Sequence, residues 1–217
     1  MKDFLRHPLL SSLGVDHGFG TVGSAPRPQC LVLRQTHGTQ VLSSRESRSQ
    51  EGPLEGDGLI SGDQGEEVGV FTADCLPVLA AAESGEFVGA FHAGWRGAAA
   101  GIVPAGIRRF GEMGKILPAD IRVVLGPAIG PCCFEVGPEV WEAVRSNTPS
   151  YVQGPRRTLD LWALVTHQLL EVGVPLENIG RIPLCTRCHP DLFFSHRGWG
   201  IRRKGRSMLN YIRRERR

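Results

Sequence analysis

The chain of 217 residues contains no uninterrupted apolar run that approaches the roughly 20 residues of a membrane-spanning helix. Its first residues, MKDFLRHPLLSS, carry charges and lack the apolar core of a secretory signal. Hydrophobic residues make up 41% and charged residues 22%, close to the average for ordered soluble proteins. We therefore expect a cytoplasmic protein without a membrane partner.

Internal repeats, low-complexity tracts and a strong excess of one charge are also missing. The net charge of +3 is too small to indicate a general polyanion binder, although arginines gather near the end of the chain. We expect one domain over residues 1–217, as a monomer or homodimer, with a basic tail from about residue 202 that forms a short helix. Nucleic acid is not expected as a partner, because one basic tail is weak support; a zinc-containing nucleic-acid-binding protein is kept as a distant third hypothesis.

A disulfide framework is not expected, because the cytosol is a reducing compartment. We expect the cysteines to be thiols, metal ligands or nucleophiles: Cys30, Cys75, Cys132, Cys133, Cys185 and Cys188. The segment CTRCH (185–189) matches the attachment pattern of c-type haem, but that modification normally accompanies export. No second cysteine pair with zinc-ribbon spacing is present, so a structural zinc site is not expected either.

Short apolar runs bounded by Gly, Pro and Asp predict a strand-rich fold. The expected strands or strand-turn units lie at 30–36, 57–62, 67–82, 85–95, 121–130 and 177–186. Helices are expected at 98–110, at 138–146 after a starting proline, and at 159–172, where Asp160 starts the first turn, and a long loop at 43–57. Because helices and strands do not alternate one for one, the pattern favours an α+β fold of packed sheets with outer helices.

Three polar residues stand in apolar, strand-like surroundings: His37 in RQTHGTQV, Cys75 in FTADCLPV and His92 in GAFHAGWRG. Each is expected to end a strand beside a turn. Imidazole and thiolate suit a divalent cation of intermediate softness, and three ligands leave a fourth position open for water or substrate. Spacing alone does not bring such distant residues together, and a single buried His or Cys is more often part of the core.

The sequence around these residues resembles that of the YfiH family. Its members are also called laccase-like proteins or polyphenol oxidases and are described as purine nucleoside phosphorylases. The resemblance runs over nearly the whole chain, through HGFGT (17–21), QTHGTQV (35–41), DGLIS (57–61), TADCLPVL (72–79), FHAGWRG (91–97), LGPAIGPCCFEVG (125–137) and CTRCHPDLFFSHR (185–197). It implies a four-layer α/β/β/α arrangement of mixed sheets with outer helices.

The resemblance also implies a metal centre formed by His37, Cys75 and His92, holding Zn²⁺ or Cu²⁺. The implied reactions are phosphorolysis of adenosine, inosine and methylthioadenosine, a transferase activity, and hydrolytic deamination of adenosine. The implied partners are therefore purine nucleosides and phosphate. Zinc fits deamination in outline, since it lowers the pKa of a bound water to about 7.

Further residues are candidates for binding and catalysis. Arg96 is a candidate for holding phosphate through its planar guanidinium. Asp74 and Cys75 are candidate catalytic residues, Asp74 by orienting a ligand or transferring a proton, although it is equally suited to cap a turn. Candidates for the pocket wall are Cys132, Ser195, His196 and Arg197.

Two departures from the family pattern concern the pocket. The segment between HGFGT and QTHGTQV is short, and Val22 stands where family members often carry an arginine, so we expect altered substrate affinity and specificity.

A rival hypothesis makes Cys75 a nucleophile activated by His92, as in a thiol hydrolase or deamidase. That hypothesis leaves the second histidine without a role. Multicopper oxidase chemistry is disfavoured, because a chain with seven histidines has too few to surround several copper ions.

Overall fold

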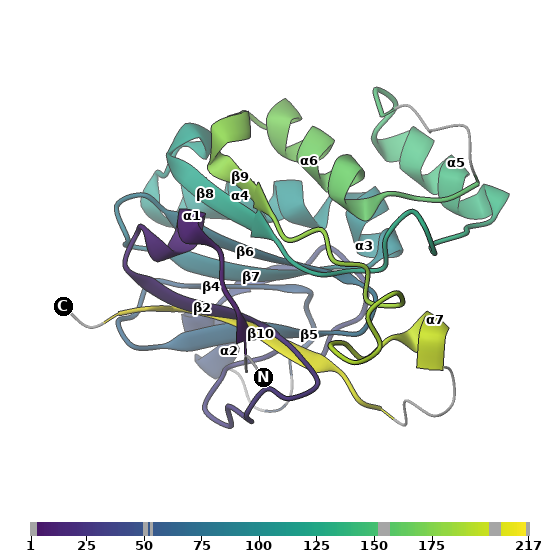
Figure 1. Ribbon diagram of the computed structural model, residues 1–217. Coiled ribbons are helices and arrows are strands. Elements are labelled where there is room, and N and C mark those ends of the chain that lie inside the picture. The colour runs from purple at the N-terminus through teal and green to yellow at the C-terminus, as the bar shows by residue number, and fades with distance from the viewer. Residues whose placement is uncertain (1–3, 50–51, 53, 152–156, 200–204, 216–217) are drawn as a thin grey trace.

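The computed structural model describes residues 4–49, 52, 54–151, 157–199 and 205–215, and its framework is a pair of packed β-sheets (Figure 1). The smaller sheet contains, in spatial order, β1 (Phe4–Leu5), β2 (Val15–Gly20), β10 (Met208–Arg214) and β5 (Glu67–Thr72). The larger, mixed sheet contains β3 (Val41–Ser43), β4 (Gly58–Ser61), β7 (Val88–Ala93), β6 (Leu76–Ala82), β8 (Ile121–Leu125) and β9 (Ile179–Arg181).

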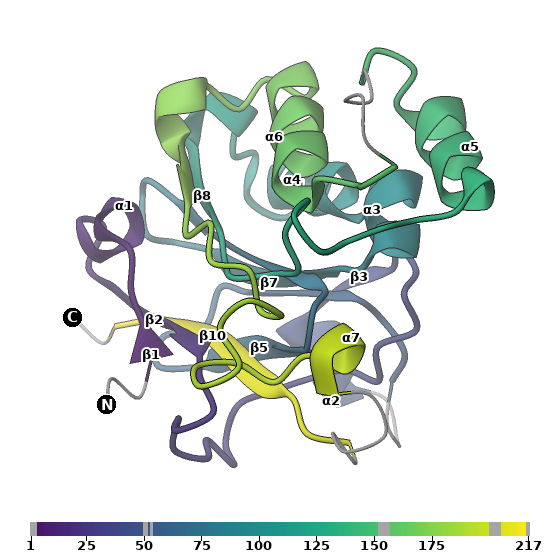
Figure 2. The same ribbon diagram turned by 45° about the vertical axis from the view of Figure 1, so that its right-hand side comes forward.

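Helices cover the face of the larger sheet that points away from the smaller one (Figure 2). The helices of this layer are α3 (Trp95–Ala100), α4 (Ile102–Gly114), α5 (Pro138–Asn147) and α6 (Leu161–Glu171). Shorter helices lie elsewhere along the chain: α1 (Pro8–Ser11), α2 (Ser44–Ser49), α7 (His196–Trp199), and the 3₁₀ turns Pro118–Asp120 and Leu176–Asn178. The expected α+β class, with packed sheets and outer helices, is confirmed.

The central strand β6 connects two hydrophobic cores. Leu76, Val78 and Ala80 face the helices, whereas Leu79 and Ala81 face the smaller sheet, and all five are fully buried. Successive side chains of a strand point to opposite faces, so burial on both faces requires the continuous apolar run seen in the sequence. Burying each valine or leucine side chain contributes about 1.5–3 kcal/mol. The strand is therefore a firm support for the turn that precedes it.

Several expected elements are confirmed and others are modified locally. The helix at 138–146 is α5, and the helix at 159–172 is α6, where the Asp160 side chain accepts a hydrogen bond from Ala163 N–H. The single helix expected at 98–110 is wrong: Gly101, with φ 87°, separates α3 from α4. Left-handed backbone of this kind favours glycine and ends a helix.

Two loop and strand expectations are also corrected. The 43–57 segment, expected to be a long loop, contains α2, while residues 50, 51 and 53 lie outside the described residues. The 30–36 strand is present only as two isolated bridges, because Leu31 pairs briefly with Val68 of β5 and Arg34 pairs with Glu55 outside the sheets. The apolar run predicted a strand here, but it could not show that most of these residues pair with no neighbouring strand.

The basic C-terminal segment is a strand, not the short helix expected from its sequence. β10 lies between β2 and β5 and pairs antiparallel with both. Met208, Asn210, Tyr211 and Ile212 are buried, and the arginines come at the end of the strand, where Arg213 bonds Asp16 at 2.9 Å. Residues 202–204 and 216–217 of this segment lie outside the described residues. Within the described ranges, no helix has the length and apolar character needed to cross a membrane.

Candidate functional site

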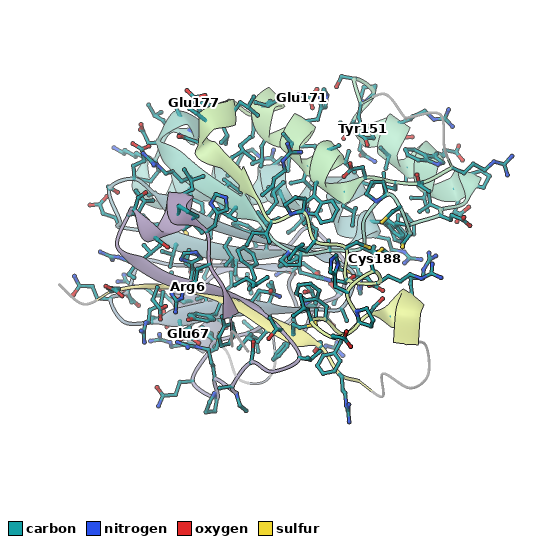
Figure 3. All side chains as sticks on the ribbon, in the orientation of Figure 1. Arg6, Glu67, Tyr151, Glu171, Glu177 and Cys188 are labelled. Carbon is teal, nitrogen blue, oxygen red and sulfur yellow. The ribbon has the colours of Figure 1, made fainter. Side chains whose placement is uncertain are left out.

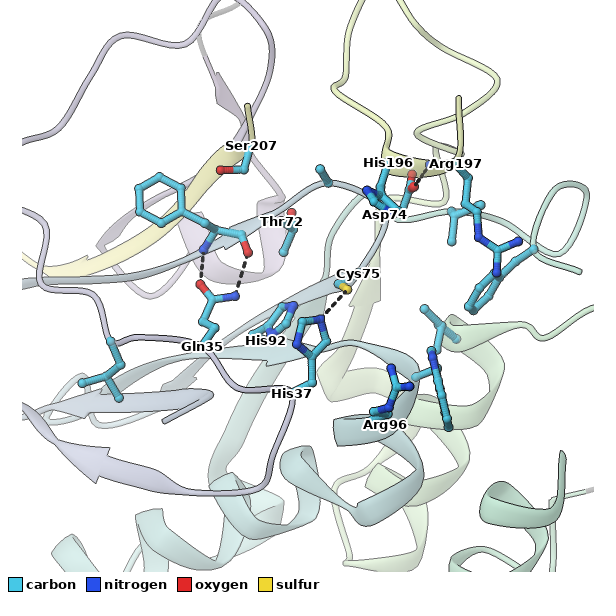
Figure 4. A pocket seen from close by; sticks show the side chains of 17 residues that line it. Gln35, His37, Thr72, Asp74, Cys75, His92, Arg96, His196, Arg197 and Ser207 are labelled. Carbon is cyan, nitrogen blue, oxygen red and sulfur yellow. Dashed lines mark hydrogen bonds between the residues drawn. The ribbon is translucent and has the colours of Figure 1, made fainter. Parts of the chain in front are cut away.

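Three donor side chains from separate parts of the chain converge beside the first residues of β6 (Figure 4). His37 precedes β3, Cys75 lies in the turn between β5 and β6, and His92 is in β7. Their ligand atoms all lie within 4.8 Å of one another, with His37 Nε2 3.9 Å from Cys75 Sγ. The imidazole centroids of His37 and His92 are 4.7 Å apart and the rings are nearly perpendicular. The site thus places two nitrogens and one sulfur around one point.

The Asp57 carboxylate organises two of these donors. Oδ1 lies 2.7 Å from Nδ1 of His92 and accepts a hydrogen bond from His37 N–H at 2.9 Å. Oδ2 accepts from the N–H groups of Thr36 and Gly38 and from the Thr36 hydroxyl. Because His92 uses Nδ1 to bind the carboxylate, its Nε2 is left for a ligand or substrate. Asp57 therefore fixes both a loop and a ring orientation.

Gly94 supplies the space that the cluster requires. A Cβ at this position would lie 2.8 Å from His37 Cδ2 and 3.0 Å from Cys75 Sγ. His37 itself has φ 63°, a left-handed conformation that costs a non-glycine residue energy. The Asp57 bonds to the surrounding N–H groups offset that cost. His37 is therefore positioned by the space at Gly94 and by the hydrogen bonds of Asp57, which stabilise its left-handed backbone.

The electrostatics of the cluster favour a charged sulfur. Burial alone would raise the pKa of the Cys75 thiol, but His37 and His92 lower it to about 7 through hydrogen bonding and charge. Burial would likewise lower the pKa of His92, yet Asp57 and Cys75 raise it to about 9. The pKa of Asp57 is about 2, since hydrogen bonds from His92, Gly38 and Thr36 outweigh its burial. The thiolate, the form that binds metals, is thus accessible near neutral pH.

The donor set fits a divalent metal ion. Thiolate and imidazole are the ligands preferred by ions such as zinc and copper, and the spacing of the donor atoms is compatible with a shared ion. The carboxylate–histidine contact of Asp57 is the arrangement that commonly supports a metal-binding imidazole. His37, Cys75 and His92 are therefore a candidate metal site.

A cavity of about 620 Å³ opens beside the three donors. Its wall includes three aromatic side chains, Phe71, Trp95 and Phe134. Phe71 is 41% exposed to solvent, although the other residues of β5 are buried. The Gln35 side chain holds this part of β5 by bonding both N–H and C=O of Phe71. The cavity combines apolar faces with a polar floor, as ligand pockets usually do.

Basic side chains contribute to the wall of the same cavity. Arg96, His196 and Arg197 all line it and are exposed. The Arg96 guanidinium stacks on the Trp95 ring at 4.3 Å from its centroid, and no carboxylate pairs with it among the described residues. Arg197 donates to the Glu135 carbonyl at 3.3 Å. The guanidinium N–H groups of Arg96 are consequently available to bind an anion.

Asp74 also lines the cavity, and its carboxylate joins two distant segments. Oδ1 accepts from the Thr186 hydroxyl at 2.6 Å, and Oδ2 accepts from Arg197 N–H at 2.7 Å. The side chain is buried and its backbone has φ 99°. These bonds hold the turn that carries Cys75 against the segment that carries His196. The observed contacts are those of a positioning residue.

Three residues considered from the sequence lie away from the cavity wall. Ser195, the residue before α7, is buried, and its hydroxyl accepts from Gly198 N–H in that helix. Cys132 lies in a separate cluster of cysteines, 3.6 Å from Cys188 Sγ. Val22 bonds the Leu192 carbonyl through its N–H and is not among the lining residues. Their contribution to substrate binding stays a prediction.

Sequence reasoning overlooked Asp57 and Phe71. Asp57 begins the DGLIS segment directly before β4, and an acid entering a buried strand is an informative signal because it needs partners. Phe71 gave no comparable signal, since an aromatic residue in a strand is usually part of the core. Only the pairing of β5 with β10 shows that this side chain faces outward.

A family model and the similar proteins both identify the family of this chain. The family model described as multi-copper polyphenol oxidoreductase laccase matches residues 19–214. Purine nucleoside phosphorylase YlmD of Geobacillus stearothermophilus is 35% identical over 186 residues, 79% of this chain and 68% of the relative. Adenosine deaminase RL5, from an unknown prokaryotic organism, is 34% identical over 197 residues, 84% of this chain and 74% of the relative.

A solved structure agrees with these relatives. The crystal structure of Bacillus licheniformis hypothetical protein YfiH superimposes with a TM-score of 0.79 and 26% identity, covering 92% of each chain. The family match includes all three donor residues and every strand of both sheets except β1 and the first part of β2. The chain therefore belongs to the YfiH family of laccase-like proteins.

Proposed function

We propose that this protein is a metal-dependent enzyme that cleaves purine nucleosides with phosphate and also deaminates adenosine. The observation that carries the proposal is the convergence of His37, Cys75 and His92 at one cavity, where Asp57 orients the two histidines. Arg96 lines the same cavity and pairs with no carboxylate in the part of the chain that the structure describes. Relatives of this chain are named purine nucleoside phosphorylase and adenosine deaminase, which supports the same substrate class. Zn²⁺ is the favoured ion, with Cu²⁺ as the alternative.

The cavity suits a nucleoside in size and in character. Its volume of about 620 Å³ lies within the range of small-molecule pockets. Phe71 and Trp95 offer flat apolar surfaces, and an aromatic side chain that stacks on a base contributes about 1–3 kcal/mol. We assign Phe71 to stacking on the purine, because its ring is already exposed while its backbone is held by Gln35.

Phosphorolysis requires an oriented phosphate near the sugar. The bond between C1′ of the ribose and the purine nitrogen breaks, and a phosphate oxygen forms the new bond to C1′. The electron pair of the broken bond stays on the purine nitrogen, which takes up the proton lost by the hydrogen phosphate, giving the free base and ribose 1-phosphate. Arg96 is the residue we assign to phosphate, since its guanidinium is stacked on Trp95 and unpaired among the described residues. Bidentate contacts from a fixed guanidinium orient the nucleophile and reduce the entropy lost on reaction.

Deamination replaces the exocyclic amine of adenine with oxygen from water and releases ammonia. A bound Zn²⁺ supplies Lewis acidity and an open coordination position for this reaction. Asp57 holds the His92 ring in a fixed orientation, and Asp74 holds the turn that carries Cys75 against Thr186 and Arg197. Both acids thus maintain the donor geometry on which the reaction depends.

The thiol hydrolase hypothesis remains as a second candidate because of one observation. Cys75, with a pKa of about 7 beside His37 and His92, has the environment of an activated cysteine nucleophile. In that case the protein would be active without metal. Activity that survives complete chelation would favour this candidate, whereas activity lost on chelation and restored by Zn²⁺ would exclude it.

The test is product analysis of purified protein with adenosine, with and without phosphate, together with metal analysis. We expect adenine only when phosphate is present, and inosine in both cases. Cys75→Ala should remove metal and both activities. Cys30→Ala is the matched control, because Cys30 lies against β5 away from the cavity. A metal-free, inert wild type, or a Cys75→Ala variant that keeps full turnover, would overturn the proposal.

A further inference from the structure

Four cysteines form a second cluster, distinct from the donors at the cavity. Cys132 and Cys133 lie in the turn after β8, and Cys185 and Cys188 lie in the segment between β9 and α7. More than fifty residues separate the two pairs, yet all four sulfur atoms lie within 4.8 Å of one another. Cys188 is on the side of the molecule that carries α7 (Figure 3).

Two of the sulfur–sulfur distances in the cluster are close to those of a tetrahedral zinc site. With zinc–sulfur bonds of about 2.3 Å, the edge between two sulfurs in a tetrahedral site is about 3.8 Å. Cys188 Sγ lies 3.6 Å from Cys132 Sγ and 3.4 Å from Cys133 Sγ. One sulfur cannot form a disulfide with two partners, so its near-equal distances to both suit a shared ion better than a covalent pair.

The backbone around the cysteines already has the form of a binding site. An isolated parallel bridge joins Ala128 to Cys185, and Thr186 N–H bonds the Ala128 carbonyl, so the two turns lie side by side. Gly130 N–H donates to Cys185 Sγ at 3.2 Å, a contact that stabilises a thiolate ligand. A Cβ on Gly130 would lie only 3.3 Å from Cys132 Sγ and from Cys185 Cβ. The backbone bonds therefore hold the two turns together, and the Gly130 N–H positions the Cys185 sulfur.

We propose that Cys132, Cys133, Cys185 and Cys188 form a structural Zn²⁺ site that is separate from the His37–Cys75–His92 site. Four thiolates close the coordination sphere of zinc and leave no open position, so the ion acts on structure and not on the reaction. The expectation of no structural zinc site is revised, because it considered only pairs with ribbon spacing. Here the C-x₂-C pair at 185–188 is completed by the adjacent pair at 132–133, which only the fold brings near.

The ion connects to the cavity through Thr186. This residue lies within the 185–188 loop, and its hydroxyl donates to Asp74, the neighbour of Cys75. Phe134, one residue after Cys133, lines the cavity. Binding zinc at the cysteines therefore fixes one wall of the cavity and the turn that presents Cys75. Loss of this ion should loosen the first site without removing any of its ligands.

The experiment measures zinc content and ligand type on the full chain, prepared under reducing conditions with Zn²⁺. If both sites are filled, wild type holds two zinc ions, and Cys132→Ser/Cys188→Ser loses one and keeps a site with nitrogen and sulfur ligands. A Cys75→Ala/His92→Ala variant should keep one ion, with X-ray absorption showing four sulfurs at about 2.3 Å and no imidazole. That second variant separates this proposal from the proposed catalytic function, since it retains the structural ion even when activity is lost.

A measurement on wild type covers the case in which a serine variant does not fold. Zinc should protect the four thiols of this cluster from maleimide, in addition to Cys75 of the first site. Chelation should expose Cys132, Cys133, Cys185 and Cys188 to labelling, as located by peptide mass mapping. The proposal is overturned if zinc leaves their labelling unchanged, if they are joined by disulfides in reduced preparations, or if the Cys75→Ala/His92→Ala variant holds no zinc.

Discussion

Oδ1 of Asp57 lies 2.7 Å from Nδ1 of His92, and neither residue has more than a small fraction of its side chain exposed. The same oxygen accepts a hydrogen bond from His37 N–H. One buried carboxylate therefore sets the positions of two of the three donors. This relationship gives the site its geometry before any ligand is bound.

Asp57→Asn should weaken metal binding and lower turnover by about 10- to 100-fold, the usual effect of removing a carboxylate that supports a metal-binding histidine. The amide keeps the size of the side chain but cannot accept from all of its present donors. Asp63→Asn is the matched control, because Asp63 is a partly exposed acid that pairs with Arg45 away from the cavity. Metal titration and initial rates measure both effects. Unchanged metal affinity in Asp57→Asn would contradict the orienting role.

Arg96→Ala should raise the KM for phosphate by about 10- to 150-fold, because hydrogen bonds to a charged group contribute about 1.5–3 kcal/mol. Deamination of adenosine without phosphate should change little, since that reaction needs no anion. Arg108→Ala, on the exposed face of α4, is the control. Steady-state kinetics with varied phosphate separates the two reactions. An equal loss of both activities would show that Arg96 does not act through phosphate.

Phe71→Ala should raise the KM for nucleoside in both reactions by about 5- to 150-fold, the equivalent of about 1–3 kcal/mol of base stacking. Phe71→Tyr should retain most of the affinity, because the ring is kept. Leu117→Ala removes another exposed apolar side chain far from the cavity and should leave kinetics unchanged. If Phe71→Ala alters only thermal stability, the aromatic ring has no part in recognition.

A pH-dependent stability is expected from His17, which is fully buried and accepts a hydrogen bond at Nε2 from His7 N–H. Burial lowers the pKa of His17 below 6.5; the Val15 carbonyl and Asp16 raise it, whereas Arg6 and His7 lower it further. The unfolded chain therefore binds more protons below pH 6.5 than the folded chain does. Consequently the free energy of unfolding should fall as the pH drops through this value.

His17→Gln is the variant that checks this expectation. Glutamine does not titrate, so the difference in unfolding free energy between wild type and variant should shrink as the pH falls from about 7.5 to about 5.5. Comparing the two proteins cancels the pH dependence of the metal ligands, which both retain. Urea unfolding followed by circular dichroism gives the measurement. A difference that is constant across this pH range would assign the effect to other groups.

The local sequence was enough to predict elements that are completely buried, such as β6, or that are capped by a neighbouring residue, such as α6. The apolar run of β6 is buried on both faces, and Asp160 caps α6, so pattern and capping chemistry alone predicted them. The donors His37, Cys75 and His92 were also identified in advance, because each lies in a short segment characteristic of the family. No local rule predicted that their side chains meet.

The tertiary structure decided what depends on pairing between distant segments. The arginines around β10 suggested a solvated helix, yet the strand is buried through Met208 and residues 210–212 and lies between β2 and β5. The preference of a segment for a strand depends on the strands that it packs against. The residues of β10 therefore do not predict a strand by themselves, because β2 and β5 are distant in the sequence. The Asp57–His92 contact and the four-cysteine cluster arise in the same way, since each joins side chains that only the packed sheets bring within bonding distance.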